Sequence, residues 1–467
     1  MGDAMLLRVE GDPADPRQTL LLSEAFHLGF LRREEAYTAY RRGGRYLRHT
    51  PPPDVEDAAA SFGLVADLDS ATNPYEVDFD FTPDELGRNR LAVLIGRNGT
   101  GKTQLLLALL DALKTTADEP RFSASRQLPS TTFPIEADLE AAARWGKPLL
   151  SRVIVFSSTG SDLYPDAIPP WHDIDYQFFS MTGAGERGAN ALTTALTDCM
   201  RDDHRNTFDN PTPDPDGLDD RRHGRLELLR RVLRPSGLWT RLHLPIRPGA
   251  ADDLGVVLSF EGQDYFPIAQ NLNEKRQLHR VQFADLARGP VVLNEAMRPR
   301  RLSSGETAML RFAAQAISAV ETGSLFLFDE PETHLHPSFV SDFAEILHTL
   351  LEATGSIAIA ATHSAYLVRE APSSRVRVLT IDDQLVSVDQ PRLQTFGASI
   401  DSISQAVFQD GRISHQFQET LKSWLAARPD ITIDAIIEEV GDEVNRETLS
   451  YLRRLVRHRD APAAEEL

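Results

Sequence analysis

Short, wholly apolar runs bounded by polar residues recur along the chain. Such runs are typical of strands buried on both faces of a parallel sheet. They occur at 91–95 (LAVLI), 325–328 (LFLF) and 357–361 (IAIAA), and the segment 151–158 (SRVIVFSS), with the apolar run VIVF at its centre, is a further candidate for a buried strand. Apolar positions return at helical spacing directly after the first run and again at 307–320 and 337–353. This alternation of strands and helices predicts an α/β fold with a mostly parallel sheet.

Other segments give shorter signals. Alternating residues predict strands at 5–10, 75–81, 376–381 and 384–388, and strand-like pieces at 255–260 and 264–269. Helices are expected at 31–41, at 221–234 and through most of 397–459, with turns at 51–53 and 208–217. We therefore predict a first α/β part at 1–159, a mainly helical insertion at 160–290, a second α/β part at 291–390 and a helical C-terminal region at 391–467.

Composition narrows the class of protein. The chain has 467 residues, 41% of them hydrophobic and 25% charged, and a formal net charge of −20. That charge argues against a surface built for non-specific DNA binding, although a local basic groove stays open. The single cysteine, Cys199, rules out an internal disulfide framework. With no apolar run of membrane-spanning length and no secretory pattern at the start, we expect a cytoplasmic protein and no membrane contact.

A glycine-rich loop follows the first apolar run. Residues 96–103, GRNGTGKT, fit the pattern G-x-x-x-x-G-K-[ST] between a predicted strand and a predicted helix. Glycines let the backbone N–H groups turn inward around phosphate oxygens, the lysine reaches the β- and γ-phosphates, and the threonine hydroxyl binds Mg²⁺. The loop predicts an ATP and Mg²⁺ site formed by Gly96, Asn98, Gly99, Thr100, Gly101, Lys102, Thr103 and Gln104.

Two later strands end in polar residues that suit the same site. LFLF ends at Asp329 and Glu330; the first is the expected Mg²⁺ ligand and the second the base that polarises an attacking water. IAIAA is followed by Thr362 and His363. A helix and a strand separate Glu330 from His363, which would return His363 to the same sheet edge. Glu330 and His363 are therefore the candidate catalytic residues.

The stretch LSSGE at 302–306 precedes the helix at 307–320. A serine followed three residues later by a glutamate is also a helix cap, and in isolation that interpretation is favoured. In a chain that also has the glycine-rich loop at 96–103 and the acid Asp329, the helix N-terminus at 303–306 becomes a candidate phosphate cradle. Its residues are Ser303, Ser304, Gly305 and Glu306.

Together these motifs resemble the head of an ABC-type ATPase. In chain order they correspond to Walker A or P-loop (96–103), the signature (302–306), Walker B (325–330) and the switch histidine (His363). Ser304 replaces a glycine of the usual LSGGQ or LSGGE signature. DEPETHLHP at 329–337 resembles the D-loop of the RecF/OLD-like branch, and the segments RVIVFSSTGSDLYP and TFGASIDSISQAVF resemble ATPases of anti-phage systems such as the Septu ATPase. No clear Q-loop glutamine follows the strand at 151–158; Gln177 is a weak candidate.

The resemblance implies a homodimer that closes head-to-tail around two ATPs, with each signature contacting the nucleotide of the other chain. It favours an ATPase that controls a separate effector, a nuclease, in anti-phage defence. A RecF-like repair ATPase that binds DNA itself is the alternative, and a transporter subunit is the third. The arginine-rich stretch at 221–234 is interpreted first as a solvated helix face and second as a DNA-facing stripe on the insertion. Asp382 and Asp383 lack the spacing of a TOPRIM nuclease, so built-in nuclease chemistry is not expected.

Overall fold

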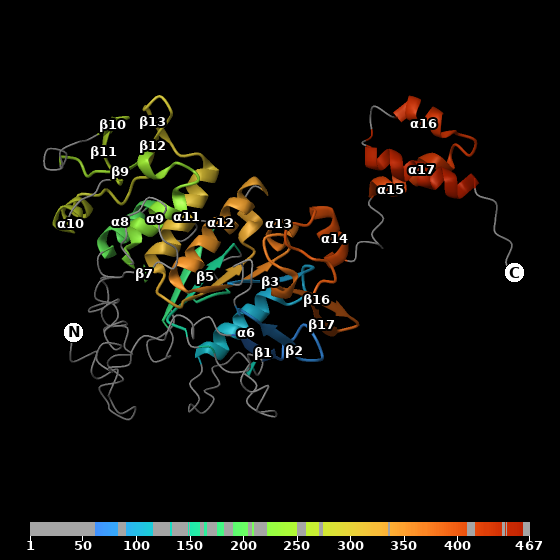
Figure 1. Cartoon of the computed structure of the whole chain (residues 1–467), viewed down its shortest axis with the longest axis horizontal. Coiled ribbons are helices and arrows are strands. Elements are labelled where there is room, and N and C mark those ends of the chain that lie inside the picture. The colour runs from blue at the N-terminus through green and yellow to red at the C-terminus, as the bar shows by residue number, and fades with distance from the viewer. Residues whose placement is uncertain are drawn as a thin grey trace. The chain divides into compact units, whose positions relative to one another are not determined.

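The computed structural model places most of the chain in a layered α/β arrangement (Figure 1). It describes residues 61–82, 90–114, 131–132, 148, 150–158, 163–165, 175–181, 190–203, 208–209, 222–249, 258–269, 274–334, 337–408, 416–440, 444 and 446–460. The predicted elements at 5–10, 31–41 and 51–53 lie outside these residues. Within them are two compact units, in residues 1–403 and 404–467, which are treated separately below.

A seven-stranded sheet forms the centre of the first unit, among the described strands. Its order is β17 (Leu385–Asp389), β16 (Val376–Asp382), β3 (Leu91–Gly96), β15 (Ile357–Thr362), β14 (Leu325–Asp329), β5 (Val153–Ser157) and β6 (Tyr176–Ser180). All neighbouring pairs are parallel except β16 and β17. The apolar runs of the sequence are the central strands, so the predicted α/β fold is confirmed.

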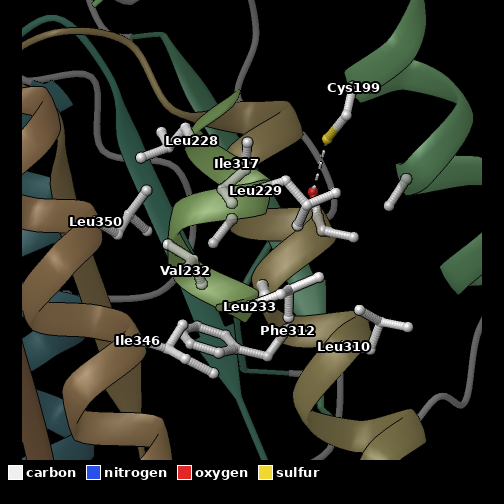
Figure 2. Close-up of a cluster of buried hydrophobic side chains, with 14 of the residues drawn as sticks. Cys199, Leu228, Leu229, Val232, Leu233, Leu310, Phe312, Ile317, Ile346 and Leu350 are labelled. Carbon is white, nitrogen blue, oxygen red and sulfur yellow. Dashed lines mark hydrogen bonds between the residues drawn. The ribbon is translucent and has the colours of Figure 1, made fainter. Parts of the chain in front are cut away.

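The two faces of this sheet have separate cores because alternate strand residues point in opposite directions. Val153 and Val155 of β5 join a cluster with α6 (Lys102–Lys114), β1 (Phe62–Ala66) and β2 (Tyr75–Phe79). Ile154 and Phe156 join a cluster with α8 (Ala191–Asp202), α9 (Arg225–Leu233), α11 (Ser304–Ala319) and α12 (Pro337–Thr354). Figure 2 shows this second core, in which leucines of α9 pack between α11 and α12.

Two antiparallel sheets of three or more strands accompany the central one among the described residues. β1 pairs with β2 and with β4 (Thr131–Thr132). The larger sheet has the order β10 (Leu258–Phe260), β11 (Gln263–Pro267), β9 (Leu242–Pro245), β12 (Val291–Leu293) and β13 (Pro299–Arg301). The segment 160–290 thus contains α8, α9 and α10 (Glu274–Gln282), and also strands. Because β9 pairs with β12, this sheet extends across residue 290. The predicted domain boundaries stay predictions.

Short elements complete both units. β7 (Phe208–Asp209) pairs with β8 (Arg222–His223), and α13 (Ala365–Val368) follows β15. Asp383 and Gln384, at φ +46° and +64°, form the two-residue turn between β16 and β17, a conformation typical of such hairpins. α14 (Ile400–Phe408) crosses into the second unit, where α15 (Gln416–Ala426), α16 (Ile433–Val440) and α17 (Arg446–Asp460) share a small core. No described helix has the length and apolarity needed to cross a membrane.

Candidate functional site

The polar residues predicted to work together follow three adjacent parallel strands, β3, β15 and β14. In the register of these strands, Ile95 lies opposite Thr362, and Asp329 lies opposite Ala361. The P-loop, His363 and Glu330 come directly after these positions, so the carboxyl ends of all three strands deliver them to one edge of the sheet. Such an edge is where α/β sheets bind ligands.

The P-loop has the backbone that a phosphate cradle requires. Gly99 and Gly101 have φ of +85° and +81°, in the left-handed region that favours glycine. The Lys102 ammonium lies inside the loop and donates to the carbonyl oxygens of Gly96 and Arg97, at 2.8 and 3.0 Å. Burial lowers the pKa of Lys102, while the carboxylates of Glu330, Asp329 and Glu332 oppose this shift. These residues fit a bound nucleoside triphosphate, because a glycine-rich loop at a helix N-terminus and its lysine cation suit phosphate oxygens.

Tyr75, on β2, supports this loop and was not predicted from the sequence. Its hydroxyl donates to the carbonyl oxygen of Thr100 at 3.0 Å and lies 2.8 Å from the Ser70 hydroxyl. A Cβ at Gly101 would approach that tyrosine oxygen to 2.6 Å, so only glycine fits there without movement. The antiparallel sheet that contains β1 and β2 therefore supports one side of the P-loop through Tyr75.

Asp329 is fully buried at the end of β14 and receives hydrogen bonds on both oxygens. The Thr103 hydroxyl donates to Oδ1 at 3.0 Å, and the Tyr164 hydroxyl donates to Oδ2 at 3.2 Å. The hydroxyl and carboxylate oxygens of Thr103 and Asp329 are the ligand type that Mg²⁺ prefers, so the pair fits that ion. Burial, together with the nearby Asp329 carboxylate, raises the pKa of Tyr164 well above its usual range.

Glu330 adopts a strained backbone conformation, with φ of +51°. Non-glycine residues in this region are uncommon and cluster at functional sites. Its N–H donates to the Ala361 carbonyl oxygen at 2.9 Å, which joins it to β15. Its Oε2 lies 3.4 Å from Nδ1 of His363. The two candidate catalytic residues are therefore side by side.

The signature begins α11, and both interpretations of LSSGE hold in part. Ser303 is the N-cap: its Oγ accepts from the Glu306 N–H at 3.2 Å, and Glu306 accepts from the Ser303 N–H at 2.9 Å. Since Oγ serves only as an acceptor in this capping box, its hydroxyl proton is available to a ligand. Ser304 occupies the first helical position, where the backbone does not require glycine, so its replacement of a signature glycine causes no strain.

Two neighbours hold this signature in place. Arg300 of β13 makes two hydrogen bonds to the Glu306 carboxylate, at 2.7 and 2.8 Å. Chiefly for that reason the pKa of Glu306 is lowered to about 2. A Cβ at Gly305 would meet the Phe339 ring of α12 at 2.4 Å, so that glycine is required by packing. The described contacts of Ser303 and Glu306 are local, and α11 covers the sheet face opposite α6.

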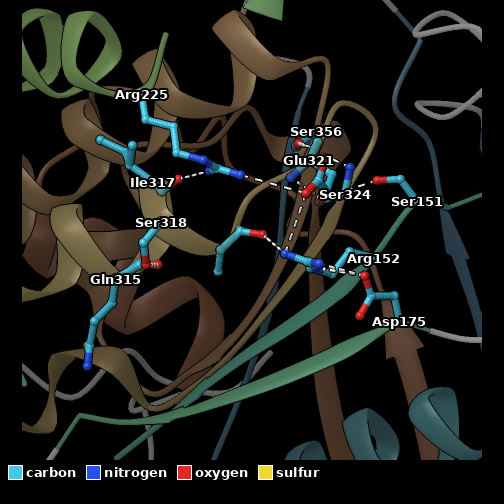
Figure 3. Close-up of polar contacts among 11 residues, drawn as sticks. Ser151, Arg152, Asp175, Arg225, Gln315, Ile317, Ser318, Glu321, Ser324 and Ser356 are labelled. Atoms are coloured by element: carbon cyan, nitrogen blue, oxygen red, sulfur yellow. Dashed lines mark hydrogen bonds and ion pairs between the residues drawn. The ribbon is translucent and has the colours of Figure 1, made fainter. Parts of the chain in front are cut away.

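The other end of α11 is fixed by two buried arginines (Figure 3). Arg152, beside β5, donates to the Ala319 carbonyl oxygen, and Arg225, at the start of α9, donates to that of Ile317. Arg152 also pairs with Asp175 at 2.6 Å, and both arginines lie within 4 Å of Glu321. Arg225 belongs to the arginine-rich stretch 221–234, for which a solvated helix face and a DNA-facing stripe were both considered. Neither interpretation holds for Arg225, because its side chain is fully buried against Glu321 and the Ile317 carbonyl oxygen.

The fold and these residues define an α/β domain that carries a P-loop of the ATPase type at the carboxyl edge of a mostly parallel sheet. Residues 201–369 match the family model described as "AAA domain, putative AbiEii toxin, Type IV TA system". This range includes the signature, Walker B and His363. Assignment to the RecF/OLD-like branch or to a Septu-like system stays a hypothesis.

Known proteins resemble the chain over most of its length. Protein ea59 of Escherichia phage lambda is 22% identical over 425 residues, which are 87% of this chain and 70% of that protein. The SMC head domain from Thermotoga maritima is 10% identical, with a TM-score of 0.30 over 72% of this chain and all of that one. An ATP-binding cassette of an ABC transporter is 12% identical, with a TM-score of 0.30 over 75% and 95%.

Proposed function

We propose that the chain binds and hydrolyses ATP as a head-to-tail homodimer. The observation that carries the proposal is the gathering of Lys102, Thr103, Asp329, Glu330 and His363 at one sheet edge. Bound ATP and Mg²⁺ supply the phosphoryl group and the charge that activates it. Lys102 and the loop N–H groups hold the phosphates, and Thr103 and Asp329 hold the metal.

The remaining groups act on the attacking water. Glu330 has a side chain 23% exposed, so its carboxylate is reachable by a water molecule and can accept its proton. His363 is 45% exposed beside it and can bind the γ-phosphate. Ser303 offers its hydroxyl proton and helix N-terminus on the opposite sheet face. A second copy of the chain is needed to bring that group to the nucleotide, which is why we propose a dimer.

We further propose that this dimer controls a separate effector, a nuclease, in anti-phage defence. The description of the matching family as a putative toxin of a toxin–antitoxin system supports a role beside a partner protein. DNA binding by the chain itself is the second candidate. It is supported by α17, where Arg453, Arg454 and Arg457 are exposed while Leu452 and Val456 face the small helical core.

Glu330→Gln tests the ATPase proposal. The amide keeps the shape of the side chain but cannot take a proton, so hydrolysis should fall about 100-fold or more while ATP affinity stays within about threefold. Light scattering should show a dimer that persists with ATP. Glu352→Gln is the matched control, since Glu352 lies on α12, 4.0 Å from His348 in a similar His–Glu pair. Hydrolysis by the Glu330 variant at the wild-type rate would show that the base is another residue.

A further inference from the structure

A third carboxylate lies in the candidate site and has no role in the function proposed above. Glu332 belongs to the short helical turn Pro331–His334 that follows Walker B. Its side chain is 8% exposed, and its Oε1 accepts from the Thr362 hydroxyl at 2.5 Å and from the His363 N–H at 2.9 Å. Burial of a carboxylate is costly unless its charge is used. The two hydrogen bonds from the end of β15 both go to Oε1 of Glu332 and leave its other carboxylate oxygen, Oε2, without one of them.

The same carboxylate also faces the imidazole of His363. Oε1 of Glu332 lies 3.3 Å from Nδ1, and Oε2 of Glu330 lies 3.4 Å from the same atom. Oε2 of Glu332 is buried without a hydrogen-bond partner among the described residues. The negative charge of Glu332 also acts on Lys102. Glu332 therefore lies against the histidine and carries a charge that also acts on the P-loop lysine.

The two carboxylates around Nδ1 require a proton on that ring nitrogen. Carboxylate oxygens have only lone pairs to offer, so an unprotonated Nδ1 would be a third acceptor facing two others. Nδ1 therefore keeps its proton, and a phosphate oxygen, which also only accepts, is bound by Nε2–H of the doubly protonated ring. In metal and catalytic sites a histidine tautomer is commonly fixed in this way by the partner of its second nitrogen.

We propose that Glu332 is a positioning residue for His363. Glu332 holds Nδ1–H of the imidazole toward the carboxylates and so directs Nε2–H toward the γ-phosphate. The proposal rests on the ATPase function above. Glu330 cannot fill this role throughout a turnover, because it must engage the attacking water. Glu332 can, because its contacts with Thr362 and the His363 backbone involve no reacting group.

Glu332→Gln separates this role from a structural one. Glutamine keeps an oxygen for the Thr362 hydroxyl and the His363 N–H but removes the charge beside Nδ1. We expect kcat to fall about tenfold or more, with KM for ATP within about threefold. Thr362→Val is the matched control: it removes a hydrogen bond to Oε1 and leaves that charge. If Glu332 only anchors the end of β15, Glu332→Gln lowers kcat no more than Thr362→Val does, because glutamine keeps the anchoring oxygen, and the proposal is overturned.

A double-mutant cycle with His363→Ala tests whether Glu332 acts through the histidine. In that background, Glu332→Gln should change kcat by no more than about twofold, because the ring it positions is gone. An equal loss in both backgrounds would mean that Glu332 acts on its own and would overturn the proposal. Thermal unfolding of each variant, within a few degrees of wild type, excludes a general loss of fold.

A spectroscopic measurement on the full chain does not depend on hydrolysis. With ¹⁵N-labelled histidine, the signal absent in His363→Ala identifies His363, and its nitrogen shifts report which ring atom carries the proton. We expect a protonated Nδ1 in the wild type and a changed shift in Glu332→Gln. An unprotonated Nδ1, or an unchanged shift, refutes the proposal even if the protein hydrolyses ATP. Absence of hydrolysis in the wild type would refute the proposed function alone.

Discussion

Tyr164→Phe removes the hydroxyl group that donates a hydrogen bond to Asp329, a proposed Mg²⁺ ligand. The phenol is 2% exposed, and its hydroxyl donates to Oδ2 of the fully buried Asp329 carboxylate. Thr103 donates to the other oxygen. The variant keeps the ring and its packing against Phe178, and it changes only the group that orients Asp329. We expect it to weaken Mg²⁺ binding and to leave the chemistry intact.

The size of the effect follows from the hydrogen bond that is lost. A hydrogen bond to a charged group contributes about 1.5–3 kcal/mol, which corresponds to a factor of about 10–150 in an equilibrium constant. The distance of 3.2 Å is at the long end for an O–H donor, so the lower part of that range applies. Residues that orient a metal ligand typically change metal affinity by about 10–100-fold, which agrees with this figure.

The assay is ATP hydrolysis as a function of Mg²⁺ concentration, at saturating ATP. The Mg²⁺ concentration for half-maximal rate should rise about tenfold in Tyr164→Phe, and kcat at high Mg²⁺ should return to within about threefold of wild type. Tyr176→Phe is the control: Tyr176 is 5% exposed, and its hydroxyl has no described hydrogen bond to Asp329. A half-maximal Mg²⁺ concentration within twofold of wild type, or a loss that Mg²⁺ does not restore, would refute the reasoning.

Two further predictions concern the signature. Ser303→Arg places a long cation at the N-cap, so light scattering should show no dimer with ATP while equilibrium nucleotide binding is retained; an unchanged dimer contradicts the trans role. Glu306→Gln should lower the free energy of unfolding at pH 7 by about 1 kcal/mol, after allowance for solvent screening. Because the pKa of Glu306 falls from 4.5 to about 2 on folding, this contribution is complete above pH 4.5 and is lost as pH falls through 2. In urea titrations the deficit should shrink by about 60% at pH 3, and a constant deficit contradicts the cause.

The sequence predicted the elements that depend on local pattern. Continuous apolar runs identified the central strands, because a strand buried on both faces cannot alternate. The P-loop was recognisable because phosphate binding requires glycine at fixed spacing, and Gly99 and Gly101 do have left-handed backbones. The roles of the site residues were placed by the same argument and stay predictions until tested by experiment.

Residues that join the site through tertiary contacts escaped prediction. Tyr164 reaches Asp329 from an irregular segment, and Tyr75 reaches the P-loop from the antiparallel sheet that contains β1 and β2. Glu332 gave one usable signal, a second acid two residues beyond the proposed base. Arg225 was expected at the surface because it lies in an arginine-rich stretch, but its side chain is fully buried. Its burial depends on Glu321 and the end of α11, which no local pattern reveals.

The fixed ends of α11 give the signature helix a mechanical property. Its 16 residues span about 24 Å. One end is joined to β13 and α12 through Arg300 and Phe339, and the other to β5 and α9 through Arg152 and Arg225. A rigid rod held in this way carries a displacement from end to end. A tilt of about 5° moves the far end by about 2 Å over that length. In the proposed dimer, a movement of α11 caused by ATP of the second chain binding at Ser303 would therefore also displace α9.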